Sequence, residues 1–176
     1  NSNSGGTAWP NVTSATSLNA GTYHTYATVA ATTNYAAATT ATKSFTISKA
    51  TPTVTLSATS GSVTYNSTNT FTVKSSVAGK MAVTSGTTAN VTITGGNGAS
   101  LTANTASTVT YKGVKATTTA VTITVVVTPT DTTNYNSVTK TYSVTAVNKA
   151  TPTVTLSATS GSVTYNSTKT FTVTSS

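Results

Sequence analysis

The chain has 176 residues, of which 6% are charged, and a net charge of +8. It has no cysteine, which excludes an internal disulfide framework, and no apolar run reaches the 18 residues that a membrane-spanning helix needs. It has one histidine and one carboxylate. Because catalysis needs groups that exchange protons or attack a substrate, we predict a non-enzymatic protein with no catalytic residues, cofactor or metal site.

The positive charge does not indicate a nucleic-acid partner. The chain has no arginine, the residue that contacts phosphate or guanine through two hydrogen bonds. The lysines are scattered rather than clustered: Lys43, Lys49, Lys74, Lys80, Lys112, Lys115, Lys140, Lys149 and Lys169. We expect them to keep surfaces and sheet edges soluble, with weak attraction to an anionic wall polymer or glycan as an alternative.

The first 48 residues predict the closing half of a domain. Residues 1–20 are rich in Asn, Ser, Thr and Gly and predict a loop that leads into a turn at 19–21. Residues 22–29 then alternate as a strand does, with Tyr23 on the inner face and His24 on the outer one. The same alternation returns at 121–127, and the TTNY sequence of 32–35 returns at 132–135. Residues 1–48 are therefore expected to be the C-terminal half of a preceding, related domain.

Residues 49–148 predict one complete all-β domain of about seven strands. Short alternating segments are separated by turn signals every 8–12 residues, which is typical of a β-sandwich. Pro52 is expected to open the first strand and the sequence Ser60-Gly61-Ser62 to turn it. Residues 121–127 form the most hydrophobic run and are expected to be a central strand. The predicted inward side chains are Val54, Leu56, Val63, Tyr65, Phe71, Val73, Met81, Val83, Val91, Ile93, Leu101, Val109, Tyr111, Val121, Ile123, Val125, Val127, Tyr142 and Val144.

The last 28 residues repeat an earlier stretch. Residues 149–176 match residues 49–76 except that Lys169 replaces Asn69 and Thr174 replaces Lys74. The offset of 100 residues is the size of one β-sandwich domain, so the pattern indicates a tandem array. Residues 149–176 are thus predicted to be the N-terminal part of the next repeat.

The turns and joints carry a family resemblance. The stretch around Gly21-Thr22-Tyr23 and Asn34-Tyr35, with the joint Ser48-Lys49-Ala50-Thr51-Pro52, resembles the tandem repeats of bacterial immunoglobulin-like domains, in particular the MBG type of large surface proteins. Residues 49–148 are similar to another variety of bacterial Ig-like domain and share Asn134-Tyr135. The resemblance implies an Ig-like Greek-key sandwich and a cell-surface setting. It brings no catalytic residues, because its motifs are turn and joint residues.

Few side chains suggest further chemistry. We interpret His24 as a solvated cross-strand residue and Asp131 as a cap of local backbone N–H groups. A calcium site is not expected, because the joints contain no carboxylates. An internal Lys–Asn isopeptide bond has Asp131 as the one candidate acid, and an intact mass lower by one ammonia would reveal it. Four Asn-x-Ser/Thr sequences, which begin at Asn11, Asn66, Asn90 and Asn166, are expected by chance in a chain this rich in threonine.

The sequence predicts a structural role. We expect a repeat of an extracellular, secreted surface protein, adhesin stalk or filament that acts as a spacer or fibre module. Its partners would be neighbouring copies of the same repeat. Two alternatives stay open: a carbohydrate- or wall-binding adhesin domain, which Trp9 and Tyr26 exposed on one surface would favour, and an Ig-like virion decoration module.

The joint between units and the two ends of the chain also carry structural expectations. Pro152 fixes its own φ angle and biases Thr151 toward an extended conformation. We therefore expect the last strand of one unit to pass directly into the first strand of the next at Lys149-Ala150-Thr151-Pro152, as a stiff joint without unrestrained residues. We also expect residues 1–48 and 149–176 to pair with β-structure outside this chain, or to present open edges. The partner would be either a continuation of the protein or strands from another copy.

Overall fold

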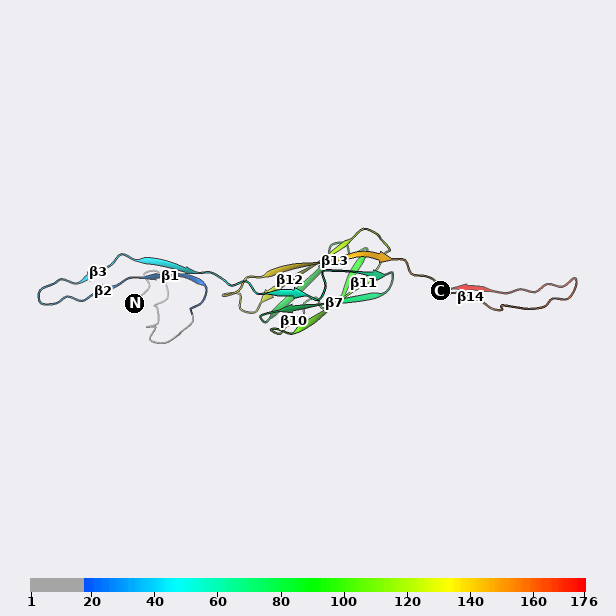
Figure 1. The fold of residues 1–176 in the computed structure, drawn as a ribbon, viewed down its shortest axis with the longest axis horizontal. Coiled ribbons are helices and arrows are strands. Elements are labelled where there is room, and N and C mark those ends of the chain that lie inside the picture. The colour runs from blue at the N-terminus through cyan, green and yellow to red at the C-terminus, as the bar shows by residue number, and fades with distance from the viewer. Residues whose placement is uncertain (1–17) are drawn as a thin grey trace.

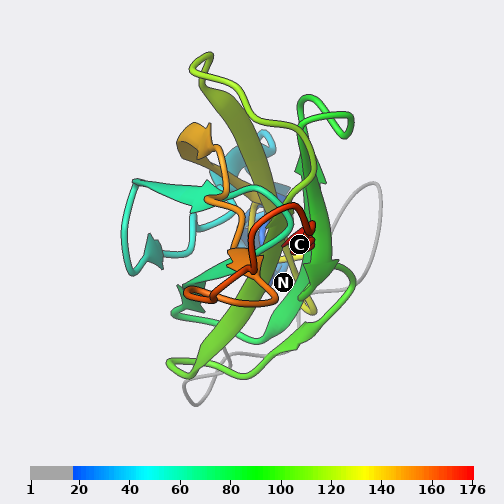
Figure 2. The ribbon, with the colours of Figure 1, turned by 90° about the vertical axis from the view of Figure 1, so that its right-hand side faces the viewer.

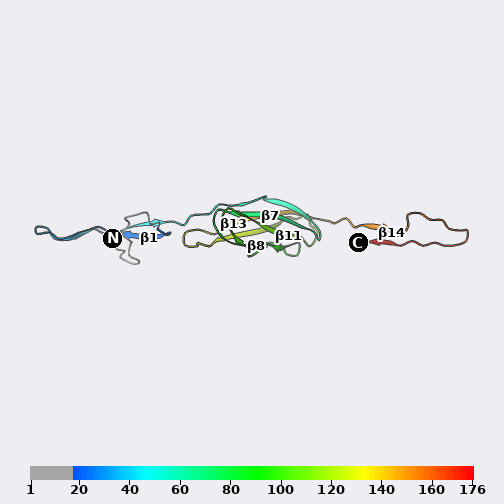
Figure 3. The same ribbon diagram turned by 90° about the horizontal axis from the view of Figure 1, so that it is seen from below.

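The computed structural model describes residues 18–176, and this part of the chain contains fifteen β-strands and no helix. The all-β prediction is therefore confirmed for these residues. The strands form three successive parts along the long axis: residues 18–48, residues 49–148, which we call the central region, and residues 149–176 (Figures 1 and 3).

The central region consists of two sheets. One has the order β10 (Ser100–Leu101), β8 (Gly79–Ser85), β12 (Val121–Pro129), β13 (Val138–Asn148) and β6 (Ser60–Thr64). The other has the order β5 (Val54–Leu56), β7 (Thr68–Ser75), β11 (Ala106–Gly113) and β9 (Val91–Gly95). The ladders are antiparallel except for β6 and β13, which run parallel. Seen along the long axis, the strands curl around a common interior (Figure 2).

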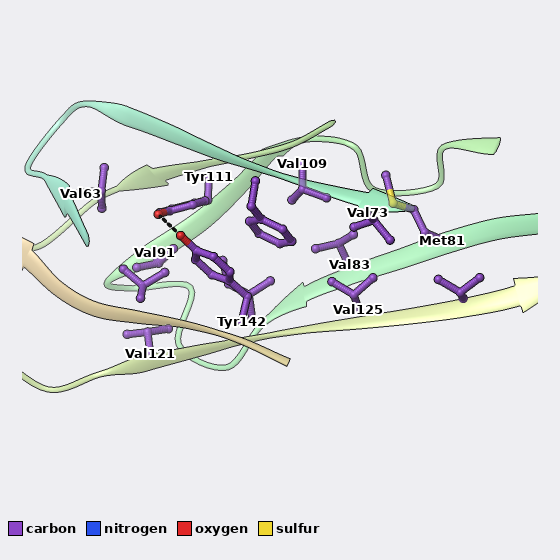
Figure 4. Close-up of a cluster of buried hydrophobic side chains, with 14 of the residues drawn as sticks. Val63, Val73, Met81, Val83, Val91, Val109, Tyr111, Val121, Val125 and Tyr142 are labelled. Atoms are coloured by element: carbon purple, nitrogen blue, oxygen red, sulfur yellow. Dashed lines mark hydrogen bonds between the residues drawn. The ribbon is translucent and has the colours of Figure 1, made fainter. Parts of the chain in front are cut away.

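Both sheets contribute to one hydrophobic core. Valines, three aromatic residues and Met81 from the two sheets pack against one another (Figure 4). The predicted inward residues are buried except for Leu56 and Ile93, which are partly buried, and Tyr65, which is 49% exposed. Val147 joins the core in addition, beyond a register shift in the pairing of β13 with β6. Alternation thus predicted which side chains are inside, because each strand has one face toward the core.

The most hydrophobic strand is central, as predicted. β12 pairs with β8 on one side and β13 on the other, and Ile123, Val125 and Val127 are fully buried.

The predicted turn Ser60-Gly61-Ser62 is wrong, because these residues belong to β6. The chain crosses between the sheets earlier, so the first predicted strand is divided into β5 in one sheet and β6 in the other. With the short edge strand β10, this brings the number of strands in the central region to nine instead of about seven. Gly61 is suited to its place because a Cβ there would overlap the Tyr142 hydroxyl. The glycine marks a close side-chain approach within a strand rather than a turn.

The N-terminal part is a pair of short ladders. β1 (Gly21–Thr25) pairs with β4 (Lys43–Ile47), and β2 (Thr28–Val29) pairs with β3 (Ala38–Thr39). The predicted strand over 22–29 is therefore interrupted at residues 26–27. Tyr23 lies opposite Phe45, with ring centroids 5.5 Å apart, as Ile123 lies opposite Tyr142 in the central region.

The C-terminal part is a single short ladder. β14 (Val154–Leu156) pairs with β15 (Val173–Ser175), and Leu156 lies opposite Val173. The earlier copy has the same register in β5 and β7, where Leu56 lies opposite Val73. The same sequence therefore has the same pairing register in both copies.

The contact between Gly61 and Tyr142 predicts a non-additive pair of substitutions. Gly61→Ala should lower the free energy of unfolding of the central region by about 1–3 kcal/mol, because the new methyl group overlaps the Tyr142 hydroxyl. In a Tyr142→Phe background the penalty should be smaller, since the overlapping atom is gone. Urea unfolding of the four proteins of this cycle measures the coupling. Ser62→Ala, an exposed position in the same strand, is the control and should be close to neutral. Equal penalties in both backgrounds would contradict this account of Gly61.

Candidate functional site

The titratable side chains His24 and Asp131 form no metal-binding cluster in residues 18–176. His24 lies half-buried in β1, opposite Ser44. In residues 18–176, no group of three or more His, Cys, Asp or Glu side chains is placed to hold a metal ion. The same residues contain no helix long and apolar enough to cross a membrane.

The buried tyrosines form a packing cluster. The hydroxyls of Tyr111 and Tyr142 are 3.1 Å apart and hydrogen-bonded (Figure 4), and Phe71 stacks on Tyr142 with centroids 4.1 Å apart. Burial, and then the hydrogen bond with Tyr142, raise the pKa of Tyr111 well above its ordinary value. The neutral phenols fill the core and satisfy each other's polar atoms, which suits a structural role.

The most organised polar feature is the turn at residues 131–136, which we call the joint turn. Asp131 Oδ1 accepts hydrogen bonds from the backbone N–H groups of Thr133 and Asn134, each at 3.1 Å. The predicted capping role of Asp131 is confirmed. Lys49 Nζ donates to the carbonyl of Thr132 at 2.7 Å. The hydrogen bonds from Asn134 lower the pKa of the Asp131 carboxyl.

The joint turn holds the linker that precedes the central region. The backbone N–H of Ala50 donates to the carbonyl of Asn134, and the N–H of Asn136 donates to the carbonyl of Ala50, both at 2.8 Å. The side-chain amide of Asn136 donates to the Lys49 carbonyl at 3.4 Å and to Thr51 Oγ1 at 3.3 Å. Successive linker residues are therefore each tied to the turn. The direct passage predicted at residues 149–152 is not observed, because β13 ends at Asn148 and β14 begins only at Val154.

The joint turn also contacts the segment before the linker. Asn134 Oδ1 accepts from the backbone N–H of Ala20 at 2.7 Å. Asn134 Nδ2 donates to Asn19 Oδ1 at 2.9 Å and to Asp131 Oδ2 at 2.8 Å. Both ends of one amide are thus used, and two of its three hydrogen bonds join segments more than 100 residues apart. A hollow of about 290 Å³ beside these groups is lined by Leu18, Ile47 and Tyr135 among others.

Sequence reasoning marked the joint turn but missed this contact. The recurring TTNY sequence identified residues 132–135 as a turn, and Asp131 as its cap, because both features are local. The role of Asn134 depends on Asn19 and Ala20, and no local pattern specifies a partner that distant in sequence.

The two copies of the repeat have opposite surroundings. In the first copy Val54, Phe71 and Val73 are 4%, 2% and 0% exposed. Their equivalents in the second copy, Val154, Phe171 and Val173, are 61%, 63% and 59% exposed. β14 and β15 form a sheet of their own, so residues 149–176 present open edges, which is one of the two outcomes expected for this segment. The same apolar side chains that build the core in one place form an uncovered face in the other.

The asparagines of the Asn-x-Ser/Thr sequences differ in exposure. Asn66 and Asn166 are exposed, and Asn90 is half-buried. Asn11 and Trp9 lie outside the described residues, so the condition that would favour the glycan-binding alternative, Trp9 and Tyr26 exposed on one surface, is not tested. An isopeptide bond, which was not expected, gains no support, because Asp131 is exposed rather than in the buried setting that such a reaction needs.

A scan against protein-family models and a search of curated proteins find no match to this chain. No family is identified, and the resemblance to bacterial Ig-like repeats stays a prediction.

The contrast between the copies predicts unequal effects of one substitution. Phe71→Ala should destabilise the central region by about 3–5 kcal/mol, because it leaves a cavity in the core beside Tyr142. Phe171→Ala changes the same residue in the same local sequence, but should leave the unfolding midpoint in urea almost unchanged. Near-ultraviolet circular dichroism of the buried tyrosines follows the transition. A comparable loss from both substitutions would mean that Phe171 is buried.

The joint turn predicts an acid-sensitive titration. Because Asn134 stabilises the charged form of Asp131, the carboxyl pKa lies below its ordinary value in the folded protein. The stabilisation is present above the ordinary pKa and is lost as the pH falls through the lowered pKa. The carboxyl carbon resonance of Asp131, followed by NMR, should titrate with a depressed midpoint that moves up in Asn134→Ala. A midpoint at or above the ordinary value would contradict the hydrogen bonding described here.

Proposed function

We propose that the central region is one immunoglobulin-like β-sandwich unit of a tandem array in an extracellular surface protein, where the array acts as a spacer, stalk or fibre. The partners of each unit are the neighbouring copies. The proposal rests on the repeat of residues 49–76 as 149–176, with a buried apolar face in the first copy and an exposed one in the second.

Three features support this function. The central region has two sheets around a single core, so it can fold from its own strands. The linker at residues 49–51 is hydrogen-bonded to the joint turn, which restricts bending between successive parts. The polar groups of the joint turn are occupied in structural hydrogen bonds, and the buried phenols are occupied in packing.

A spacer needs length and stiffness rather than a reactive site. In a tandem array each unit contacts mainly its neighbours, so length grows by duplication without redesign of the unit.

The test is an extended chain in which residues 77–148 follow Ser176 and so supply the strands that the second copy lacks. A second unit should then fold, and Phe171→Ala should become about as destabilising as Phe71→Ala, roughly 3–5 kcal/mol in urea unfolding. A scrambled version of the added segment is the control and should leave Phe171→Ala neutral. If Phe171→Ala stays neutral in the extended chain, the array is wrong.

The same extended chain separates a spacer from an adhesin. On a glycan array and with a polyanionic wall polymer, a spacer should show no saturable binding at physiological salt. Saturable binding that survives at this salt concentration would instead favour the glycan-binding alternative, because weak attraction of scattered lysines is screened.

A further inference from the structure

The joint turn has hydrogen bonds that the central region does not need for its own fold. Asn134 lies at the end of the central region that faces residues 18–48, and its amide bonds both Asn19 and Ala20. The linker, in contrast, is held by the backbone of Asn134 and by Asn136. The Asn134 side chain therefore has a separate partner.

We infer that the joint turn is a docking surface for the turn at residues 19–20 of the preceding unit, and that the Asn134 amide is the contact that fixes the orientation of one unit on the next. This inference rests on the proposed array and identifies the surface through which its units meet.

The chemistry of the contact is specific to an amide. Its oxygen accepts from the Ala20 N–H, while its NH₂ group donates to Asn19 and to Asp131. Asp131 holds the amide in position: its Oδ2 accepts the bond from the Asn134 side chain, and its Oδ1 accepts bonds from the backbone N–H groups of the same turn. A carboxylate at position 134 would lose both donated bonds and would lie next to the Asp131 carboxylate. An alanine would lose all three bonds.

Apolar contact accompanies the hydrogen bonds. Leu18, Ile47 and Tyr135 line the hollow beside the amide, and each is half-buried. Leu18 and Ile47 come from the preceding part, and Tyr135 comes from the joint turn. Partial burial of these side chains strengthens the polar contact by removing water from its edge.

The opposite end of the central region presents the equivalent partner surface. Residues 119–120 stand 100 positions after Asn19 and Ala20, and both Thr119 and Ala120 are exposed, whereas Ala20 is half-buried against the joint turn. Ala20 donates to Asn134 through its backbone N–H. Ala120 has the same backbone donor, which it can offer to the asparagine that corresponds to Asn134 in a following unit. The replacement of Asn19 by Thr119 keeps a side-chain oxygen that can accept the second bond.

The test uses the full 176-residue chain with spin labels at Ser44→Cys and Lys80→Cys, which are specific because the chain has no other cysteine. These exposed positions lie in β4 and β8, on the two sides of the joint. Electron spin resonance should give a narrow distance distribution in the parent, and broad ones in Asn134→Ala and Asn134→Asp. Hydrogen exchange of the Ala20 amide should accelerate about tenfold in Asn134→Ala, the effect of losing roughly one hydrogen bond.

Thr133→Ala is the matched control. It lies in the same turn, and its backbone N–H still donates to Asp131, so the distribution should stay narrow. The Asn134 variants also lose the bond to Asp131 within the turn, so the unfolding midpoint of the central region should fall only slightly. The near-ultraviolet circular dichroism of the buried tyrosines should stay that of the parent, which separates loss of docking from loss of folding. A broad distribution in the parent, or equal broadening by Thr133→Ala, would overturn the docking surface.

The extended chain distinguishes the two proposals. There, exchange of the Ala120 amide should slow when the second unit follows, and an Asn→Ala change in the added copy of the joint turn should restore it. If Phe171 becomes buried but Ala120 gains no protection, the docking surface is wrong and the array stands. If Phe171 stays exposed, the array is wrong, and the contact of Asn134 with residues 19–20 is an internal feature of this chain.

Discussion

The rest of the structure depends on the contact of early strands of the central region, β6 and β7, with its last strand, β13. β6 and β13 pair in parallel, and Phe71 of β7 stacks on Tyr142 of β13. Parallel strands are not joined by a tight hairpin, so this pairing forms only when distant segments meet. Residues 149–176 show the outcome without it. The same sequence keeps three residue pairs between β14 and β15, yet Phe171 and Val173 stay exposed. The repeated sequence has the same pairing register in both copies, whereas burial of its apolar side chains requires the closing strands.

This division explains how much of the fold the sequence could predict. Alternation of apolar residues identified nearly the whole core, including Ile123 and Val125, because the period of two is a local property. It did not reveal that β5 and β6 belong to different sheets, because Ser60-Gly61-Ser62 has the composition of a turn. The glycine is explained by Tyr142, which lies far along the chain. The inward prediction for Tyr65 is wrong: it follows the alternation but lies one residue past the end of β6, in an isolated bridge with Gly113, and its side chain is 49% exposed.

The candidate site divides in the same way. The cap formed by Asp131 was predictable, because an aspartate bonds to backbone groups two or three residues ahead. The bridge from Asn134 to Ala20 was not predictable, because its two ends are 114 residues apart in the sequence. Asparagine is common in turns for local reasons, so its presence does not indicate a distant partner. A repeat of the same tetrapeptide at a fixed spacing is the one available signal, and it indicates recurrence without showing the contact.

The joint combines two kinds of restraint that respond differently to sequence change. Backbone bonds between Ala50 and the joint turn hold the linker, and they do not depend on the identity of the side chains. The Asn134 amide adds an orienting contact, in which its oxygen accepts a hydrogen bond from a backbone N–H of the preceding turn. Because that donor is a backbone group, the side chains of the preceding turn can change, as from Asn19 to Thr119, without loss of the bond. Each exposed bond contributes only about 0.5–1.5 kcal/mol, but the bonds act on one short segment and must break together for it to bend. In the proposed array, duplication of a unit copies both sides of the joint at once. A compatible interface therefore comes with each new unit, and stiffness is retained as the array grows.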